Sequence, residues 1–347
     1  MLPVKKEFRK FSRKSFKDFV LGCDIGGTNT NIGVFGIKRK PKLLFSFHFK
    51  SQQLKRLHEA VNYTLNYVKN QYKINITKAC FGVAGVISPD KNNAMITKLK
   101  WHIINKELFK KTRLRKILLI NDFQAIGYAI NIIGKKDIVV IKKCPNIEKA
   151  PIIVIGAGTG LGKTTLIYND QNKFYMPLAS EAGHSDFAVQ NKDEFELVDF
   201  IKRSENIKNV SYDSILSGKG LERIYLFLTK SKKFTKFTKE INKSNNKPEL
   251  ISKYRKTDKT CKETFEIFKK IYVKFARNFA LDALPLGGIY IAGGIAPKNK
   301  DIFDKNFIKI FEQHEIHHYV LQKIPIYLIM NYDAGMLGAG FAAAKFL

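Results

Sequence analysis

The stretch VLGCDIGGTNTNIG, residues 20–33, decides how the fold is interpreted. An apolar run leads to Asp24 and a second apolar run follows the turn, which predicts two strands joined as a hairpin. Gly26 and Gly27 can take positive φ and leave no side chain in the way, so a ligand can approach the backbone N–H groups closely. Short hydroxyl and amide donors follow the two glycines: Thr28, Asn29 and Thr30. Two interpretations stay open, a phosphate-binding turn with Asp24 placed for a metal, or a tight hairpin without a ligand.

A second glycine-rich turn repeats this pattern in PIIVIGAGTGLGKTTLIY. Strands are expected over Ile152–Ile155 and Thr164–Tyr168, so the amides of Gly158, Thr159 and Gly160 lie at the turn between them. Two such turns, presented by two related domains across a cleft, could hold a polyphosphate between them. The repetition therefore favours a nucleotide site.

The segment AGTGLGKT, residues 157–164, nearly matches the Walker A loop. That loop has glycine at its first position and a helix after its threonine, whereas TTLIY predicts a strand. We therefore disfavour a P-loop ATPase or GTPase, and a helix beginning at Lys163 would restore that interpretation.

Polar side chains follow the strand expected over Lys116–Ile120. Asn121 and Asp122 come directly after it and before FQAIGYAI, which has helical spacing. Ligands gather at the carboxyl ends of strands in open α/β sheets, so this pair is a candidate for binding or catalysis. The alternative is that Asp122 caps the following helix.

The loop MPLASEAGHSDFAV, residues 176–189, concentrates polar groups. Glu181, His184 and Asp186 lie within six residues of one another, which suggests hydrogen bonding to a polar ligand. No second His or Cys stands at metal-ligand spacing from His184, so a sugar or another polar substrate is favoured over a metal site.

The length of 347 residues predicts about two domains, and the alternation of strands and helices predicts an α/β class. No apolar run approaches the ~20 residues of a membrane span. The first 17 residues are basic and lack both an apolar core and a small-residue cleavage site, so they are not a secretory signal. A short organelle-targeting or surface arm is one interpretation of these residues, and a solvated tail is the one that we favour.

The four cysteines lie far apart, which excludes a CxxC metal knuckle, argues against a disulfide framework and suits a reducing cytoplasm. The net charge of +31 invites a nucleic-acid interpretation. Only part of it is concentrated, in residues 1–17 and in the Lys-rich segment 230–263, and the rest is spread along the chain. We therefore expect no specific nucleic acid and no membrane as partner.

Two later segments predict packed helices. Aromatic side chains recur at intervals of three and four between Phe265 and Phe279, which is typical of a core helix stripe. The C-terminal AGMLGAGFAAAKF predicts a small-residue helix able to pack tightly on a neighbour. Between them, GGIYIAGGIAPK predicts a strand and a glycine turn.

Taken in order, these segments resemble the bacterial-type glucokinases, members of the superfamily of sugar kinases, actin and heat-shock ATPases. The resemblance covers the chain from about Phe19 to the C-terminus. The matching segments are DIGGTNT, INDFQAIGYA, GAGTGLG, SEAGHSDFA, LSGKGL, IAGGIAPK and MLGAG.

The resemblance implies an α/β protein with the two-domain actin-like (ribonuclease H-like) ATPase fold, in which mixed sheets are flanked by helices and the active site lies in the interdomain cleft. It implies a small domain of residues 1–132 plus 333–347, a large domain of residues 133–332, and a homodimer. The implied reaction is the phosphorylation of D-glucose at its 6-hydroxyl by ATP with Mg²⁺.

The resemblance also implies roles for individual residues. Asp122 resembles the general base that takes the hydroxyl proton, and Asp24 would orient the magnesium through water. The sugar ligands would be Asn121, Glu181, His184 and Asp213. The nucleotide contacts would be Gly26, Gly27, Thr28, Asn29, Gly158, Thr159, Gly160, Gly293 and Gly294.

Three positions depart from the family pattern: Asp213 stands where glutamate is usual, Lys98 where asparagine is usual, and Ala182 where a second glycine is usual. These departures bear on sugar preference and affinity more than on reaction type. The cysteine-rich zinc motif of the related repressors and kinases is absent, so no structural zinc is expected. A kinase for another hexose, a catalytically silent binder and a sugar-responsive regulator remain alternatives, although 17 residues before the first strand cannot supply a helix-turn-helix module.

Overall fold

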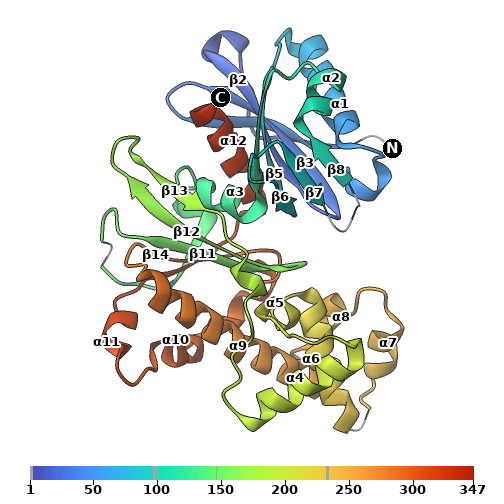
Figure 1. The fold of residues 1–347 in the computed structure, drawn as a ribbon, viewed down its shortest axis with the longest axis vertical. Helices are drawn as coiled ribbons and strands as arrows, with labels where there is room; N and C mark the ends of the chain where they lie inside the picture. Colours follow the sequence, from blue (N-terminus) through green and yellow to red (C-terminus); the bar gives the residue numbers. More distant parts are fainter. Residues whose placement is uncertain (1–2, 97–98, 100, 146, 232–233) are drawn as a thin grey trace. The chain divides into compact units, whose positions relative to one another are not determined.

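The computed structural model describes residues 3–96, 99, 101–145, 147–231 and 234–347. The chain forms two compact units, each built on its own sheet (Figure 1). The first unit is Met1–Asp137, Leu166–Ala179 and Asn331–Leu347, and the second is Ile138–Thr165 and Ser180–Met330. Lys98, one of the three departures from the family pattern, lies outside the described residues.

These units differ from the domain division expected from the sequence at residues 133–137, 166–179 and 331–332, which all belong to the first unit, and the longest of these segments is 166–179. Residues 166–179, which that division assigns to the large domain, belong to the first unit. Side chains near α3 (Asp122–Ala129) hold the segment, because Gln124 Nε2 donates to Pro177 O at 3.0 Å and Asn131 Nδ2 donates to Tyr175 O at 3.0 Å. No sequence pattern marks these hydrogen bonds.

The first unit contains a six-stranded mixed sheet with the order β1-β4-β3-β2-β5-β9. Its strands are β1 (Val4–Glu7), β2 (Asp18–Ile25), β3 (Asn29–Ile37), β4 (Pro41–Lys50), β5 (Lys78–Val83) and β9 (Lys116–Asn121). Strands β1, β4, β3 and β2 run antiparallel, whereas β2, β5 and β9 are parallel. The predicted hairpin of residues 20–33 is confirmed as β2 and β3.

The N-terminal arm is not a solvated tail, so that expectation is wrong. Strand β1 pairs with β4, and the partly buried rings of Phe11 and Phe16 pack against the core of the first unit. The arm satisfies the hydrogen-bonding groups of an otherwise open strand edge and buries aromatic area, which offsets the entropy lost on ordering it.

A second, mixed sheet has the order β10-β15-β14-β11-β12-β13, and it lies in the second unit except for β13 and the end of β12, which fall within residues 166–179 of the first unit. Its strands are β10 (Ile138–Lys142), β11 (Ile152–Ala157), β12 (Leu161–Asn169), β13 (Phe174–Leu178), β14 (Gly288–Ala292) and β15 (Ile326–Ile329). Strands β11, β14 and β15 are parallel. Because Lys163 lies inside strand β12, the P-loop alternative is excluded.

The two sheets repeat one topology. In each, a three-stranded run in reverse chain order is followed by two later parallel strands: β4-β3-β2-β5-β9 in the first sheet and β13-β12-β11-β14-β15 in the second sheet. Strands β1 and β10 are extra edge strands outside this repeat. The similarity between the two glycine-rich turns therefore follows from the repeated topology of the two sheets.

Helices cover both faces of the first sheet (Figure 1). The side chains of β2 alternate, so Leu21 and Cys23 join a core with α1 (Leu57–Tyr72), while Val20 joins a core with α12 (Ala334–Phe346). Helix α2 (Asn105–Lys111) follows a small antiparallel sheet. That sheet comprises β6 (Val86–Ile87), β7 (Asn93–Ile96) and β8 (Trp101–Ile104).

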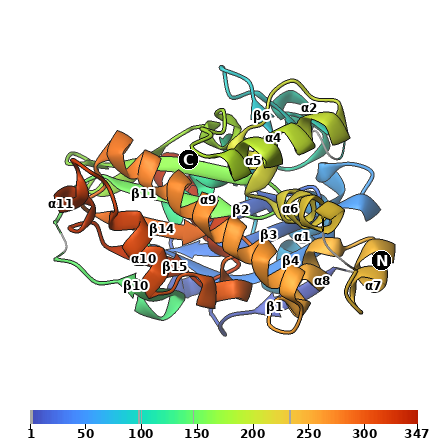
Figure 2. The ribbon, with the colours of Figure 1, turned by 90° about the horizontal axis from the view of Figure 1, so that it is seen from below.

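Helices α6, α8 and α10 pack around α9 in the second unit, and Figure 2 shows α10 beside it. The predicted aromatic stripe is confirmed, since Phe268, Tyr272 and Phe275 are buried on α9. The described residues of the Lys-rich segment 230–263 are largely helical. The helices of this unit are α4 (Lys192–Glu205), α5 (Tyr212–Ile215), α6 (Gly218–Ser231), α7 (Thr238–Lys243), α8 (Lys247–Tyr254), α9 (Lys259–Ala283), α10 (Lys305–Glu312) and α11 (His318–Leu321).

The cysteines are free thiols, and Cys144 is only half-buried, so it is not a core residue. Within the described part of the chain, none of the helices is long and apolar enough to cross a bilayer.

Helix α12 packs through its glycines, as its small-residue sequence predicts. A Cβ on Gly22 of β2 would lie 2.3 Å from the backbone N of Gly340, and a Cβ on Gly338 would lie 1.7 Å from Ala125 O of α3. The helix backbone therefore rests directly on the sheet and on α3, which leaves no room for a side chain at these positions.

We predict that Gly22→Ala lowers the free energy of unfolding by about 3 kcal/mol, because the added methyl must push α12 off the sheet. Urea unfolding of the purified variant measures this. Gly134→Ala is the matched control, since a Cβ there meets its nearest atom at 3.8 Å. An equal loss in both variants would contradict the packing argument.

Candidate active site

The first glycine turn joins β2 to β3 and is braced by Ser51, the residue directly after β4. Gly26 N–H donates to Asn29 O at 2.9 Å, while Ser51 donates through Oγ to Gly26 O at 2.7 Å and through N to Thr28 O at 3.0 Å. Among the described glycines, Gly288 and Gly293 take positive φ, so the turn at Gly26 and Gly27 does not use the left-handed conformation that glycine allows. The turn is open because Gly26 lacks a side chain.

Asn121 and Asp122 lie at the carboxyl end of β9, where α3 begins. Asn121 caps this helix, because its Oδ1 accepts from Phe123 N at 2.9 Å and from Gln124 N at 3.3 Å. Asp122 is the first helical residue, and its Oδ1 accepts from Phe123 N at 2.9 Å. The capping role considered for Asp122 thus belongs mainly to Asn121.

Asp24 stands at the same edge of the sheet as this pair. The register aligns Asp24 with Gly82 of β5, and the next β5 residue, Val83, aligns with Asn121 of β9. Two strand spacings separate β2 from β9, which is about 10 Å. The parallel strands of one sheet therefore present the first turn, Asp24 and Asp122 along one edge.

The Asp24 carboxylate is held in a largely desolvated place. Burial raises the pKa of Asp24 to about 6, with the charge of Asp333 acting in the same direction and a hydrogen bond from Asn31 opposing it. Asp333 is itself paired with Lys6 of β1, whose Nζ lies 3.2 Å from Asp333 Oδ2. The site thus contains two neighbouring carboxylates and one partly exposed ammonium group.

The second glycine turn, between β11 and β12, is held by Asp213. Gly158 N–H donates to Gly160 O at 2.8 Å, and Leu161 N–H donates to Asp213 Oδ1 at 2.6 Å. Gly218, which begins α6, donates its N–H to Gly158 O at 2.9 Å. One carboxylate oxygen of the expected sugar ligand Asp213 is therefore committed to the turn backbone.

The predicted nucleotide turn of Gly293 and Gly294 packs on this second turn. Gly293 has a φ of 85°, and a Cβ there would lie 2.4 Å from Ala157 O. Ile295 N–H donates to the same oxygen at 3.1 Å. The backbone can approach this closely only because glycine occupies position 293.

Glu181 precedes a 3₁₀ turn of the second unit, Ala182–His184, and His184 is its last residue. Both residues are exposed, and His184 N–H donates to Glu181 O at 2.9 Å. A Cβ on Gly183 would lie 2.0 Å from Leu161 O, so this turn is pressed against the start of β12. Ala182 does not take positive φ, and the backbone accepts alanine where the family has glycine.

Each unit thus assembles part of the predicted set. The first unit brings together Gly26, Gly27, Thr28, Asn29, Asp24, Asn121 and Asp122. The second unit gathers its predicted residues around the backbone of the second glycine turn, residues 157–161: Gly158, Thr159, Gly160, Glu181, His184, Asp213, Gly293 and Gly294.

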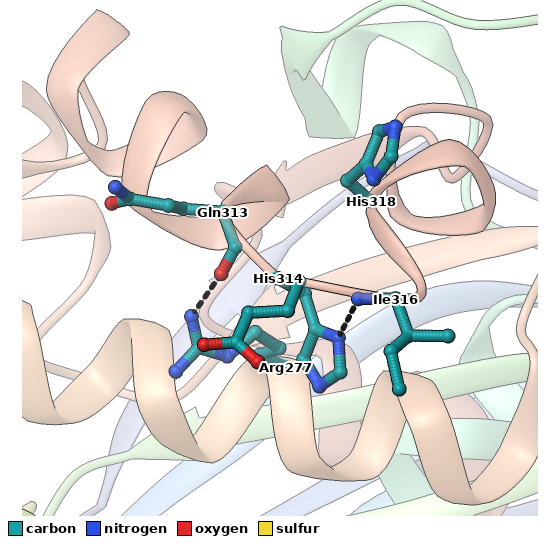
Figure 3. A pocket seen from close by; sticks show the side chains of 6 residues that line it. Arg277, Gln313, His314, Ile316 and His318 are labelled. Carbon is teal, nitrogen blue, oxygen red and sulfur yellow. Dashed lines mark hydrogen bonds between the residues drawn. The ribbon is translucent and has the colours of Figure 1, made fainter.

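A cavity of about 650 Å³ lies elsewhere in the second unit, between α9 and the segment before α11 (Figure 3). Arg277 Nη1 donates to Gln313 O at 2.7 Å, and His314 Nδ1 accepts from Ile316 N at 3.3 Å. Arg277 and His314 thus form hydrogen bonds with other residues of the cavity wall. None of the predicted site residues lines this cavity, and we assign it no part in the chemistry.

The described residues contain no group of three His, Cys, Asp or Glu side chains arranged as metal ligands. Mg²⁺ that arrives with a nucleotide typically keeps several waters and takes only one or two protein carboxylates. Asp24, with Asp333 beside it, fits that need.

Four residues around Asp24 were not assigned from the sequence: Lys6, Asn31, His48 and Asp333. Asn31 comes directly after the residues of the first glycine turn, so its place near Asp24 could have been predicted from the sequence. His48 and Lys6 carry no local signal, because only strand register brings them to Asp24.

Comparison with known proteins finds relatives that match nearly the whole chain. A family model described as Glucokinase matches residues 21–346. The chain is 33% identical over 344 residues to a glucokinase of Nostoc sp. strain PCC 7120, which covers 94% of this chain and 99% of the relative. A glucokinase structure from an Antarctic psychrotroph matches with a TM-score of 0.76 at 25% identity over 94% of this chain and 98% of that one. A Balamuthia mandrillaris glucokinase in complex with glucose shares the fold, with a TM-score of 0.77 at 19% identity over 94% and 93% of the two chains.

We predict that Asp24→Asn changes the pH dependence of stability in metal-free buffer. Because the pKa of Asp24 is raised to about 6 in the folded state, its protonated form stabilises the fold at low pH, and this contribution is lost as the pH rises from about 4 to 6. The variant should therefore gain about 2 kcal/mol relative to the unmutated protein between pH 4 and pH 8, allowing for partial exposure.

Urea unfolding in EDTA at the two pH values measures the difference. Asp193→Asn, at an exposed position in the first turn of α4, is the control and should show no such gain. A free-energy difference for Asp24→Asn that stays constant with pH would contradict the assignment.

Proposed function

The chain belongs to the glucokinase family, and we propose on that premise that it transfers the γ-phosphoryl group of ATP to the 6-hydroxyl of D-glucose. The observation that carries the proposal is the position of Asp122, at the carboxyl end of β9 on the sheet edge that also presents Asp24 and the first glycine turn. There Asp122 would accept the proton of the attacking hydroxyl, a step that typically contributes ~10² to 10⁴-fold.

Phosphoryl transfer depends on positioning and charge stabilisation more than on covalent chemistry. The backbone amides of the turns at Gly26–Asn29 and Gly158–Gly160 would hold the β- and γ-phosphate oxygens. Asp24 would orient Mg²⁺ through water, and bound Mg²⁺ would neutralise charge on the phosphates. Gly293 and Gly294 would face the adenosine side.

The sugar would be recognised by several polar groups at once. Asn121 commits Oδ1 to capping α3, so its Nδ2 would be the group that donates to a sugar hydroxyl. Glu181 and His184 are exposed, with polar ends that can reach a ligand. A hexose that lacks one hydroxyl would leave a polar partner unsatisfied, which gives strong discrimination.

The remaining features follow from family membership. Exclusion of water from the bound substrates would suppress ATP hydrolysis. We also propose a homodimer in the cytoplasm that feeds glycolysis with glucose 6-phosphate. A kinase for another hexose is the nearest alternative, since Asp213 and Ala182 depart from the family pattern in the sugar segments, and a non-catalytic sugar-responsive regulator is the second.

A coupled assay with ATP and Mg²⁺, scanned over glucose, mannose, fructose and glucosamine, tests the proposal. Glucose should give the highest kcat/KM. A higher kcat/KM for another hexose would favour the first alternative, and sugar binding without turnover would favour the regulator.

We predict that Asp122→Ala lowers kcat by roughly 10² to 10⁴-fold, because no other group replaces the base. Glucose binding, followed by calorimetry, should persist. Asp193→Ala is the matched control, since it removes a similar carboxylate from the first turn of α4 and should leave kcat unchanged. Undiminished kcat in Asp122→Ala would show that the base is wrongly assigned.

We predict that Asp213→Glu lowers the KM for glucose by about threefold, because the longer side chain restores the reach of the family's glutamate. The same assay at varied ATP tests the competing role of Asp213 at Leu161 N–H. A changed KM for ATP with an unchanged KM for glucose would assign Asp213 to the phosphate turn and remove it from the sugar pocket.

A further inference from the structure

A row of polar side chains crosses the middle of the first sheet. The strand register places Asp24 of β2 opposite Asn31 of β3, and Asn31 opposite His48 of β4. His48 Nδ1 lies 2.9 Å from Asn31 Oδ1, and His48 Nε2 lies 2.8 Å from Ser46 Oγ, which is buried. The row is continuous from Ser46 to Asp24.

The chemistry of these groups gives the row a direction. Asn31 hydrogen-bonds to the Asp24 carboxylate and favours its ionised form. An ionised carboxylate only accepts, so Asn31 must donate through Nδ2 and present Oδ1 to His48. Neutral His48 then donates from Nδ1, and its Nε2 accepts from the Ser46 hydroxyl.

The surroundings of Asp24 leave it little freedom. The row lies on the sheet face covered by α12, where a Cβ on Gly335 would be only 3.1 Å from the Asp24 carboxyl carbon. The neighbouring Asp333 is already paired with Lys6, 3.2 Å away. A carboxylate enclosed on these sides is oriented mainly by the hydrogen bond it receives from Asn31.

We propose that His48 is a positioning residue for the phosphoryl-transfer site, acting through Asn31 to hold the Asp24 carboxylate in the orientation that a nucleotide-bound Mg²⁺ requires. This inference rests on the proposed function, because it takes Asp24 as the carboxylate that meets the metal. Groups that orient a metal-binding side chain from behind commonly change metal affinity by 10 to 100-fold when removed.

A purely structural histidine is the competing explanation, and it makes a different prediction. Loss of packing at His48 would weaken the fold and all ligands alike. Loss of orientation at Asp24 would weaken only binding that involves the metal. The ratio of ADP affinities with and without Mg²⁺ therefore separates the two.

The test measures by calorimetry the dissociation constant of ADP, with Mg²⁺ and with EDTA, for the full chain and its variants. His48→Leu should weaken binding of ADP with Mg²⁺ about tenfold and leave binding in EDTA unchanged. His48→Gln, which places its amide near Nε2 and lacks the Nδ1 donor, should behave like His48→Leu. His48→Asn, which keeps a donor near Nδ1, should stay within about threefold of the unmutated protein.

Two further variants test the route of the effect. Asn31→Ala should weaken binding of ADP with Mg²⁺ as His48→Leu does, and the double variant should lose nothing more, because both changes break one chain of hydrogen bonds. His58→Leu, which replaces a histidine of α1 for which no side-chain hydrogen bond is found among the described residues, is the control. The melting temperature of each variant checks that it folds.

The outcomes also separate this inference from the proposed function. An equal loss with and without Mg²⁺, additive effects of Asn31→Ala and His48→Leu, or no loss in any His48 variant overturns the positioning role. If Asp24→Asn abolishes the Mg²⁺ effect and His48→Leu does not, only the inference fails. If Asp24→Asn leaves the Mg²⁺ effect intact, the metal role of Asp24 fails as well, while the hexose assay still decides whether glucose is phosphorylated.

Discussion

The backbone contact between α12 and β2 is the constraint on which the first unit depends. Gly22 and Gly340 allow the C-terminal helix to pack directly on β2, and Gly338 allows the same helix to pack against α3. The start of α12 therefore lies beside Asp24, and α3, which begins with Asp122, is fixed to the same helix. Residues from both ends of the chain and from its middle are aligned by one set of glycines, and any side chain there would move several parts of the site together.

Each sheet presents one amide-lined turn, and the two turns are held by different means. The turn after β2 is braced by Ser51, whose hydroxyl and amide bind Gly26 O and Thr28 O. The turn after β11 is braced by the Asp213 carboxylate at Leu161 N–H. The two glycine turns thus share a backbone arrangement but are stabilised by unrelated side chains. Ser51 follows β4, whereas Asp213 lies in α5. This explains why the glycine patterns of the two halves are similar while their supporting residues are not.

Acidic residues are scarce in this chain, with 30 against 61 Lys and Arg, and several of them have defined structural tasks. Asp258 and Asp304 cap helices α9 and α10. The buried Lys274 donates from Nζ to both carboxylate oxygens of Glu194, each at 2.6 Å. In the first unit, Asp24 and Asp333 lie together where a cation would be attracted. The large positive charge is otherwise carried mostly by solvated side chains, such as those of the Lys-rich helices α7 and α8.

Four features could be predicted from the sequence alone. They are the two glycine hairpins, the position of Asn121 and Asp122 after a strand, the aromatic stripe of α9 and the glycine-rich face of α12. All of these are local patterns in which neighbouring residues report one another's conformation. The tertiary structure alone decided that the N-terminal arm is an edge strand, that residues 166–179 join the first unit, that Asp213 binds a turn amide, and that His48 and Lys6 reach the vicinity of Asp24. These contacts join residues that are distant in sequence. They depend on strand register and packing, which cannot be recognised in the local sequence around each residue.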